Sequence, residues 1–114
     1  MVNAKYWQRG EALDYTNSTD DDIPANSVIQ LESRIGVSGC DIPAGAVGSV
    51  HMIGVFEIAK TGSSAIKMGQ AVYFDGDGIT DTAPSGTDKI TTSIGYAAAD
   101  ATADAETVMV QIGA

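Results

Sequence analysis

Apolar residues recur at every second position over much of this chain, which is the spacing of β-strands rather than helices. The alternation is clearest from residue 48 to residue 58. In a strand there, one face would carry Val50, Met52, Phe56 and Ile58, and the other Ile53 and Val55. Apolar residues on both faces predict a single long strand that is the best buried of its sheet. Gly54, inside it, predicts a bulge or a close approach by another backbone.

Shorter stretches with the same alternation predict further strands. They cover residues 12–16, 29–31, 34–38, 73–74, 90–96 and 107–112, the last with Val108, Val110 and Ile112 facing inward. Asp75-Gly76-Asp77-Gly78 is typical of a hairpin turn. Residues 97–106 are rich in alanine but have no continuous apolar stripe, so we interpret them as a loop in which a helical turn is possible.

Three segments share a short pattern of an apolar residue, a turn with Gly or Asn near its end, and the start of a strand. They are residues 23–28, 42–47 and 66–72. Pro presets φ in such turns, whereas Gly and Asn tolerate positive φ. Their spacing favours antiparallel strands over βαβ crossovers, but the units are too short and divergent to predict a solenoid.

Together these patterns predict an all-β fold with about seven to nine short strands, arranged as a small antiparallel β-barrel or sandwich. The length of 114 residues and 11.7 kDa predicts one domain spanning residues 1–114. Residues 1–10 are predicted to form an extended N-terminal arm. The 13 glycines fit many turns between short strands.

The charge balance limits the partners that the protein can have. Six Lys and Arg residues against 15 Asp and Glu residues give a formal net charge of -9. Nucleic acids and anionic membranes are therefore disfavoured, because both are bound through clustered cations. An acidic surface instead suits a partner with basic patches. No apolar run is long enough to span a bilayer, and we expect no signal peptide.

Few residues in the sequence suggest catalysis or metal binding. His51 is the sole histidine and is expected to face solvent or a subunit boundary, and Cys40 is the sole cysteine, expected to be structural. Asp75, Asp77 and Asp81 could chelate calcium, but the run lacks the closing Glu of a calcium loop, so a hairpin turn is the better interpretation. We therefore expect no catalytic residue, metal site or cofactor.

Residues Tyr6, Trp7, Gln8 and Arg9 are the best candidates for binding a partner. Trp, Tyr and Arg are enriched among the residues that dominate interface energies. The alternative is that these side chains cover one end of the barrel.

Several motifs, in order, resemble those of the small phage head proteins grouped as DUF2190, the capsid cement or decoration family. They are Gln8-Arg9-Gly10-Glu11, Leu13-Asp14-Tyr15-Thr16, Gly36-Val37, Asp41-Ile42-Pro43-Ala44-Gly45, Gly54-Val55-Phe56, Gly69-Gln70-Ala71-Val72-Tyr73-Phe74-Asp75, Ile94-Gly95-Tyr96-Ala97 and Val108-Met109-Val110. The resemblance covers nearly the whole chain.

This resemblance implies a structural role. The expected protein is an all-β subunit, a homotrimer, that sits on the outer surface of the expanded phage head and clamps neighbouring major capsid proteins. It would be made in the host cytoplasm and become part of the virion. Two alternatives remain open: a tail- or fibre-associated β-domain, and an enzyme with a site between subunits that uses His51 with Asp41 or Glu57.

Overall fold

The computed structural model describes residues 1–113, and over this range the chain contains β-strands and no helix. The strands are β1 Ala12–Thr16, β2 Val28–Gln30, β3 Ile35–Ser38, β4 Val47–His51, β5 Gly54–Ala59, β6 Ala71–Phe74, β7 Ile79–Thr80, β8 Gly95–Ala97 and β9 Thr107–Ile112. The prediction of an all-β fold is confirmed. Within residues 1–113 there is accordingly no helix long and apolar enough to cross a membrane.

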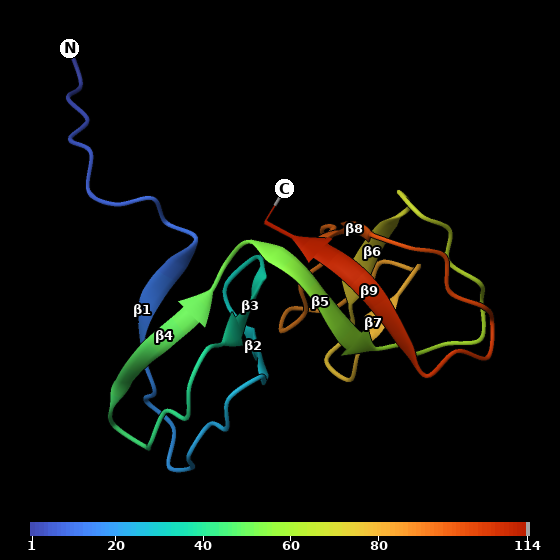
Figure 1. The fold of residues 1–114 in the computed structure, drawn as a ribbon, viewed down its shortest axis with the longest axis horizontal. Coiled ribbons are helices and arrows are strands. Elements are labelled where there is room, and N and C mark those ends of the chain that lie inside the picture. Colours follow the sequence, from blue (N-terminus) through green and yellow to red (C-terminus); the bar gives the residue numbers. More distant parts are fainter. Residues whose placement is uncertain (114) are drawn as a thin grey trace.

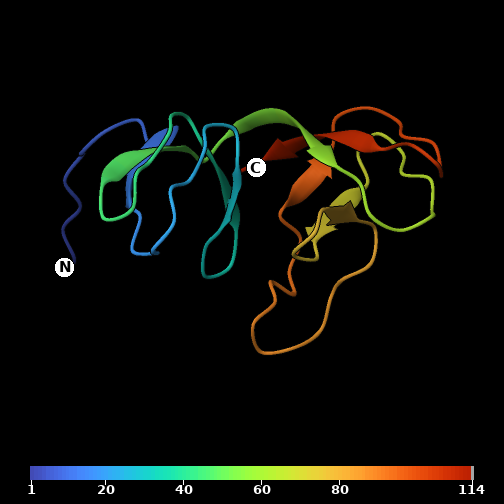
Figure 2. The ribbon, with the colours of Figure 1, turned by 90° about the horizontal axis from the view of Figure 1, so that it is seen from below.

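The strands form two antiparallel sheets that lie side by side (Figure 1). The first has the order β1-β4-β3-β2 and the second the order β5-β9-β8-β6-β7. The second sheet curls into a partial barrel, because a parallel bridge between Lys60 and Ile79 brings β7 back to the end of β5. Seen from below, the β2–β3 hairpin and the loop before β8 descend on the same side of the sheets (Figure 2).

The prediction of one long strand from residue 48 to residue 58 is wrong. The chain leaves the first sheet after His51, passes through Met52 and Ile53, and enters the second sheet at Gly54. Gly54 has a φ of 147°, which side chains rarely allow, and this conformation lets the backbone turn from one sheet to the other. The glycine is therefore a hinge between sheets rather than a bulge within a strand.

Strand β3, not the predicted central segment, is buried along its whole length. Ile35 and Val37 are 2% and 4% exposed and belong to the apolar core of the second sheet, although β3 is hydrogen-bonded within the first. Val55, by contrast, is 48% exposed. One apolar face of β5 is therefore partly exposed to solvent, although apolar residues on both faces had predicted complete burial.

The remaining strand predictions differ mainly at one place. The turn at residues 75–78 joins β6 to β7 as predicted. Of the segment 97–106, predicted as a loop, Ala97 ends β8 and residues 98–106 form the loop that follows. In the segment 90–96, however, only Gly95 and Tyr96 are in a strand. Ile90 and Ile94 are buried from a loop, and the Ser93 hydroxyl donates hydrogen bonds to the carbonyl oxygens of Val72 and Gly95. The alternating apolar residues of this segment therefore fix a loop against the core, and they do not form a β-ladder.

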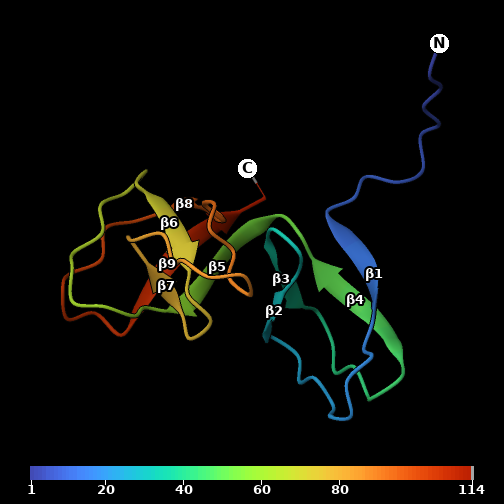
Figure 3. The ribbon, with the colours of Figure 1, turned by 180° about the vertical axis from the view of Figure 1, so that it is seen from behind.

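The two halves of the chain have the same topology. The order β1-β4-β3-β2 in residues 12–51 corresponds to β5-β9-β8-β6 in residues 54–112, with β7 and the loop that follows it added (Figure 3). Each half also has one antiparallel bridge between two turns, Ile23 with Ile42 and Ile66 with Ala101. The structure therefore contains four such turns, in two pairs, where the sequence predicted three. The fourth begins at Ala101, and it was missed because the other three begin with isoleucine.

Equivalent hydrogen bonds support this internal duplication. In the first half the Asp41 carboxylate accepts from the Ala25 amide at 2.8 Å, and in the second the Asp100 carboxylate accepts from the Met68 amide at 2.7 Å. Each aspartate directly precedes a residue of the isolated β-bridge, and its hydrogen bond stabilises the turn on the other side of that bridge. No backbone hydrogen bond within residues 1–113 joins one half to the other.

Two glycines at equivalent positions permit close packing inside the sheets. Gly36 lies opposite Ile29 and Gly95 lies opposite Val72. A Cβ on Gly95 would collide with the carbonyl oxygen of Gln111 on the neighbouring strand, and its φ of 155° is unfavourable for other residues.

We expect Gly95→Ala to destabilise the protein by at least about 3 kcal/mol, since it adds a backbone collision to backbone strain. Gly45→Ala is the matched control, because Gly45 also has positive φ but its Cβ would meet no atom within 4 Å. We expect it to cost about 1 kcal/mol. Urea unfolding of both variants measures the difference, and equal losses would contradict the collision.

Candidate interaction surfaces

The N-terminal arm, residues 1–10, extends away from the sheets (Figure 1). Tyr6 and Trp7 are 79% and 84% exposed. Arg9 makes an ion pair with Glu11 at 2.7 Å, with both side chains exposed, so the pair adds little stability. The four predicted binding residues are thus held by no other part of the chain that the structure describes. They do not cover the end of the barrel.

The arm differs in charge from the rest of the protein. It contains Lys5 and Arg9 and no acidic residue, whereas residues 11–114 contain the other four cationic residues and all 15 acidic ones. The body is therefore strongly anionic and the arm cationic. This separation favours contacts between the arm of one molecule and an acidic surface of another.

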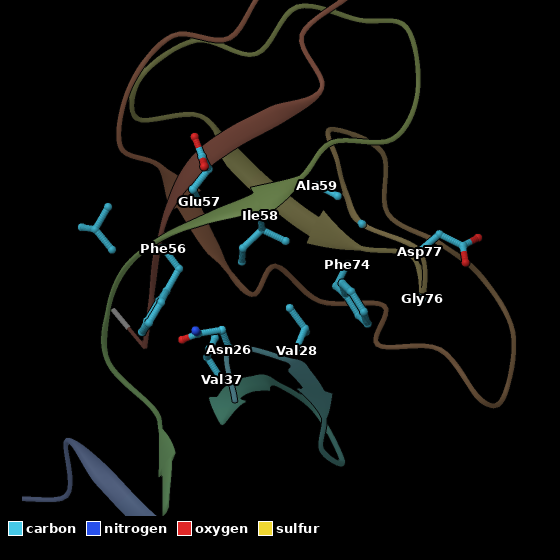
Figure 4. A pocket seen from close by; sticks show the side chains of 12 residues that line it. Asn26, Val28, Val37, Phe56, Glu57, Ile58, Ala59, Phe74, Gly76 and Asp77 are labelled. Atoms are coloured by element: carbon cyan, nitrogen blue, oxygen red, sulfur yellow. The ribbon is translucent and has the colours of Figure 1, made fainter. Parts of the chain in front are cut away.

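A groove of about 510 Å³ lies between the two sheets (Figure 4). We call it the inter-sheet groove; its walls are β5, the β2–β3 pair and the β6–β7 turn. Its apolar lining includes Val28, Val37, Phe56, Ile58 and Phe74. Glu57 points to the opposite side of β5 from Phe56 and Ile58, and Asp77 lies at the β6–β7 turn (Figure 4).

Strand β5 is the edge strand of its sheet at this groove. The Lys60 amide donates to the carbonyl oxygen of Glu106, one position beyond the Ala59–Thr107 pair that ends the ladder between β5 and β9. Because hydrogen-bonded pairs alternate in antiparallel sheets, the backbone groups of Val55 and Glu57 point away from β9. Neither residue has another backbone partner within residues 1–113.

His51 is exposed, as predicted, and its ring packs beside Phe56 with a centroid separation of 6.0 Å. The carboxylates considered with it have other partners: Asp41 accepts from Ala25, and Glu57 accepts from the Thr107 hydroxyl at 3.3 Å. Within residues 1–113 of one copy, no hydrogen bond or ion pair joins His51 to either carboxylate. Cys40 is a free, exposed thiol.

The Asp75 carboxylate stabilises the β6–β7 turn. It accepts hydrogen bonds from the amides of Asp77 and Gly78, both at 2.9 Å, and from the Thr61 hydroxyl at 2.6 Å. Burial raises the pKa of Asp75, but these hydrogen bonds and the Lys89 ammonium outweigh it and lower the pKa below its ordinary value. Within residues 1–113, no three His, Cys, Asp or Glu side chains are grouped so as to hold a metal ion.

The inter-sheet groove was not predicted from the sequence, because its walls come from segments distant in the chain. One signal for it was present: β5 is apolar on both faces although it lies at an edge. The sequence pattern shows apolarity but not which strand edge lacks a neighbour.

An all-β chain with an acidic body and an exposed aromatic and cationic arm has the features of a structural protein that binds through its surface. A family model described as phage cement protein matches residues 7–112. The chain therefore belongs to the phage cement protein family, and its role is structural, as a cement of the phage capsid. No curated protein and no solved structure matches the chain.

The lowered pKa of Asp75 predicts how stability depends on pH. The unfolded carboxyl titrates near pH 3.9 and the folded one lower, so the stabilisation is complete above about pH 4 and is lost as the pH falls through the folded value. We expect Asp75→Asn to destabilise the protein at pH 7 by about 1 kcal/mol and to reduce the loss of stability below pH 4.

Urea unfolding between pH 2 and pH 7 measures this dependence. Thr61→Val removes one of the three hydrogen bonds and should give part of the effect. An unchanged pH dependence in Asp75→Asn would show that the carboxylate does not contribute as described.

Proposed function

We propose that this cement protein binds the outer surface of the expanded head and stabilises contacts between major capsid proteins, and that it acts as a homotrimer without enzymatic activity. The exposed arm is the observation that supports this most directly. Its two aromatic side chains and its guanidinium group are of the types that dominate binding energies, and no contact within residues 1–113 buries them.

Multivalency explains how such a small protein can reinforce a capsid. A trimer offers three copies of its capsid-binding surface, so binding of the first copy raises the effective concentration of the others at the capsid. The acidic body limits adhesion to packaged nucleic acid, because phosphate and carboxylate repel each other. Each contact can then be weak while the whole assembly is stable.

A single domain spanning residues 1–114 is part of this proposal. Ile35 and Val37 of the first half share an apolar core with residues of the second. One calorimetric unfolding transition would agree with it, and two separate transitions would contradict it.

We expect the purified protein to bind saturably to expanded heads that lack it. Binding should raise the temperature at which the heads release DNA and increase their resistance to chelators, because each bound molecule bridges several capsid proteins. Co-sedimentation and thermal release of DNA measure these effects. Absence of binding at every salt concentration, or immunogold label only on the tail, would refute the proposal.

We expect deletion of residues 1–9 to abolish head binding without unfolding the sheets. Trp7→Ala should weaken binding by about 2 kcal/mol, or ~30-fold, as is usual for a dominant interface residue. His51→Ala, which removes an exposed aromatic side chain outside the arm, is the matched control and should bind as the native protein does. Equal binding by all variants would show that head binding does not depend on the arm.

A further inference from the structure

We propose that the N-terminal arm of one copy of this protein binds as an added β-strand along the free edge of β5 in a second copy, with Tyr6 in the inter-sheet groove. This inference rests on the proposal that the arm is a binding element. It assigns the arm to the contact between copies, so that loss of the arm weakens head binding by weakening the oligomer.

The edge of β5 offers the backbone groups that an added strand needs. The amides and carbonyls of Val55 and Glu57 point away from β9 and have no backbone partner within residues 1–113. Unpaired edges of this kind are templates for strand addition. After Ala59 the edge is already occupied by β7, because the Thr61 amide donates to the carbonyl oxygen of Ile79.

The inter-sheet groove has room for a side chain of the added strand. Its volume of about 510 Å³ falls within the range of roughly 300–1,000 Å³ typical of binding pockets. Phe56 and Phe74 lie on opposite sides of it, and Val28 lies between them (Figure 4). An aromatic side chain placed there would be surrounded by apolar groups.

The arm sequence fits this site in one orientation. In an extended strand, Lys5, Trp7 and Arg9 share one face, while Tyr6 and Gln8 share the other. Placing Lys5 and Arg9 in an apolar groove would be costly, so Tyr6 is the side chain that enters. Lys5, Trp7 and Arg9 then lie on the outer face of β5.

The outer face of β5 complements those three side chains. The Glu57 carboxylate lies there beside Val55, which is 48% exposed, and Met109 of β9, the ladder partner of Glu57, is 39% exposed. Oppositely charged and apolar cross-strand pairs are both stabilising. The arm is cationic and the body anionic, so the two copies attract each other where arm meets edge.

A second copy is a better source of the arm than the same chain. The arm leaves from β1, which lies on the side of β4 opposite β3, whereas the groove lies beyond β3. In the structure the arm runs away from the body (Figures 1 and 3). Ten extended residues span roughly 33 Å, enough to reach a neighbouring molecule.

The first test uses the full-length chain in solution, without capsids. Val55→Pro removes an edge amide but leaves the pairing with β9, because Val55 does not bond to that strand. We expect the native protein to self-associate and Val55→Pro to associate at least about tenfold more weakly, as loss of a main-chain hydrogen bond implies. Val55→Ala, the matched control, keeps the amide and should associate within about threefold of the native protein.

Sedimentation velocity measures association, and the emission of Trp7, the sole tryptophan, reports arm docking. Emission should shift to shorter wavelength as concentration rises. A native protein that stays monomeric at all concentrations would overturn the proposal, whether its tryptophan remains exposed or is docked within the same chain. Equal association of Val55→Pro and Val55→Ala would also overturn it.

A second test does not depend on the folding of the proline variant. The double variant Lys5→Glu with Arg9→Glu reverses the charge of the arm. The double variant Glu57→Lys with Asp77→Lys reverses the charge at β5 and the groove. We expect each double variant alone to associate about tenfold more weakly than the native protein, and a mixture of the two to regain association. No recovery in the mixture would overturn the proposal. Because no capsid is present, failure here would leave the proposed capsid binding to be judged by the head-binding experiment.

Discussion

Ile35 and Val37 pack into the apolar core of the second sheet, although their strand is hydrogen-bonded within the first. Burial of two such side chains stabilises the arrangement by roughly 3–6 kcal/mol. The same contact sets the spacing between the β2–β3 hairpin and β5, and hence the width of the inter-sheet groove. The groove and the free edge beside it are consequences of how the two sheets are held together.

The duplicated topology explains why the two halves can serve different purposes. In each half the strands pair only with one another, and an aspartate side chain stabilises the pair of turns. No backbone hydrogen bond joins residues 12–51 to residues 54–112. The first half carries the arm, and the second carries the edge of β5 and the β6–β7 turn. In the arrangement that we propose, the arm and the strand edge that receives it therefore belong to different halves of the chain.

Alternation in the sequence was sufficient to predict the fold class, β9 and the hairpin at residues 75–78. It failed where local pattern and tertiary position diverge. The sequence around Gly54 is compatible with a continuous strand. The chain changes direction before it because β4 and β5 pair with strands of different sheets. Ile90 and Ile94 alternate like strand residues but are buried from a loop. The exposed arm could be predicted because it depends on composition, whereas the groove could not, because it depends on the packing of distant segments.

The absence of backbone hydrogen bonds between the halves has a consequence for biosynthesis. All ladder partners of β1 to β4 lie before residue 52, so the first sheet can complete its pairing while the second is still being translated. Until β5 to β9 follow, Ile35 and Val37 lack their core. The nascent first half would then be a folded sheet with an uncovered apolar strand, which is the stage at which a ribosome-bound chaperone would have most effect.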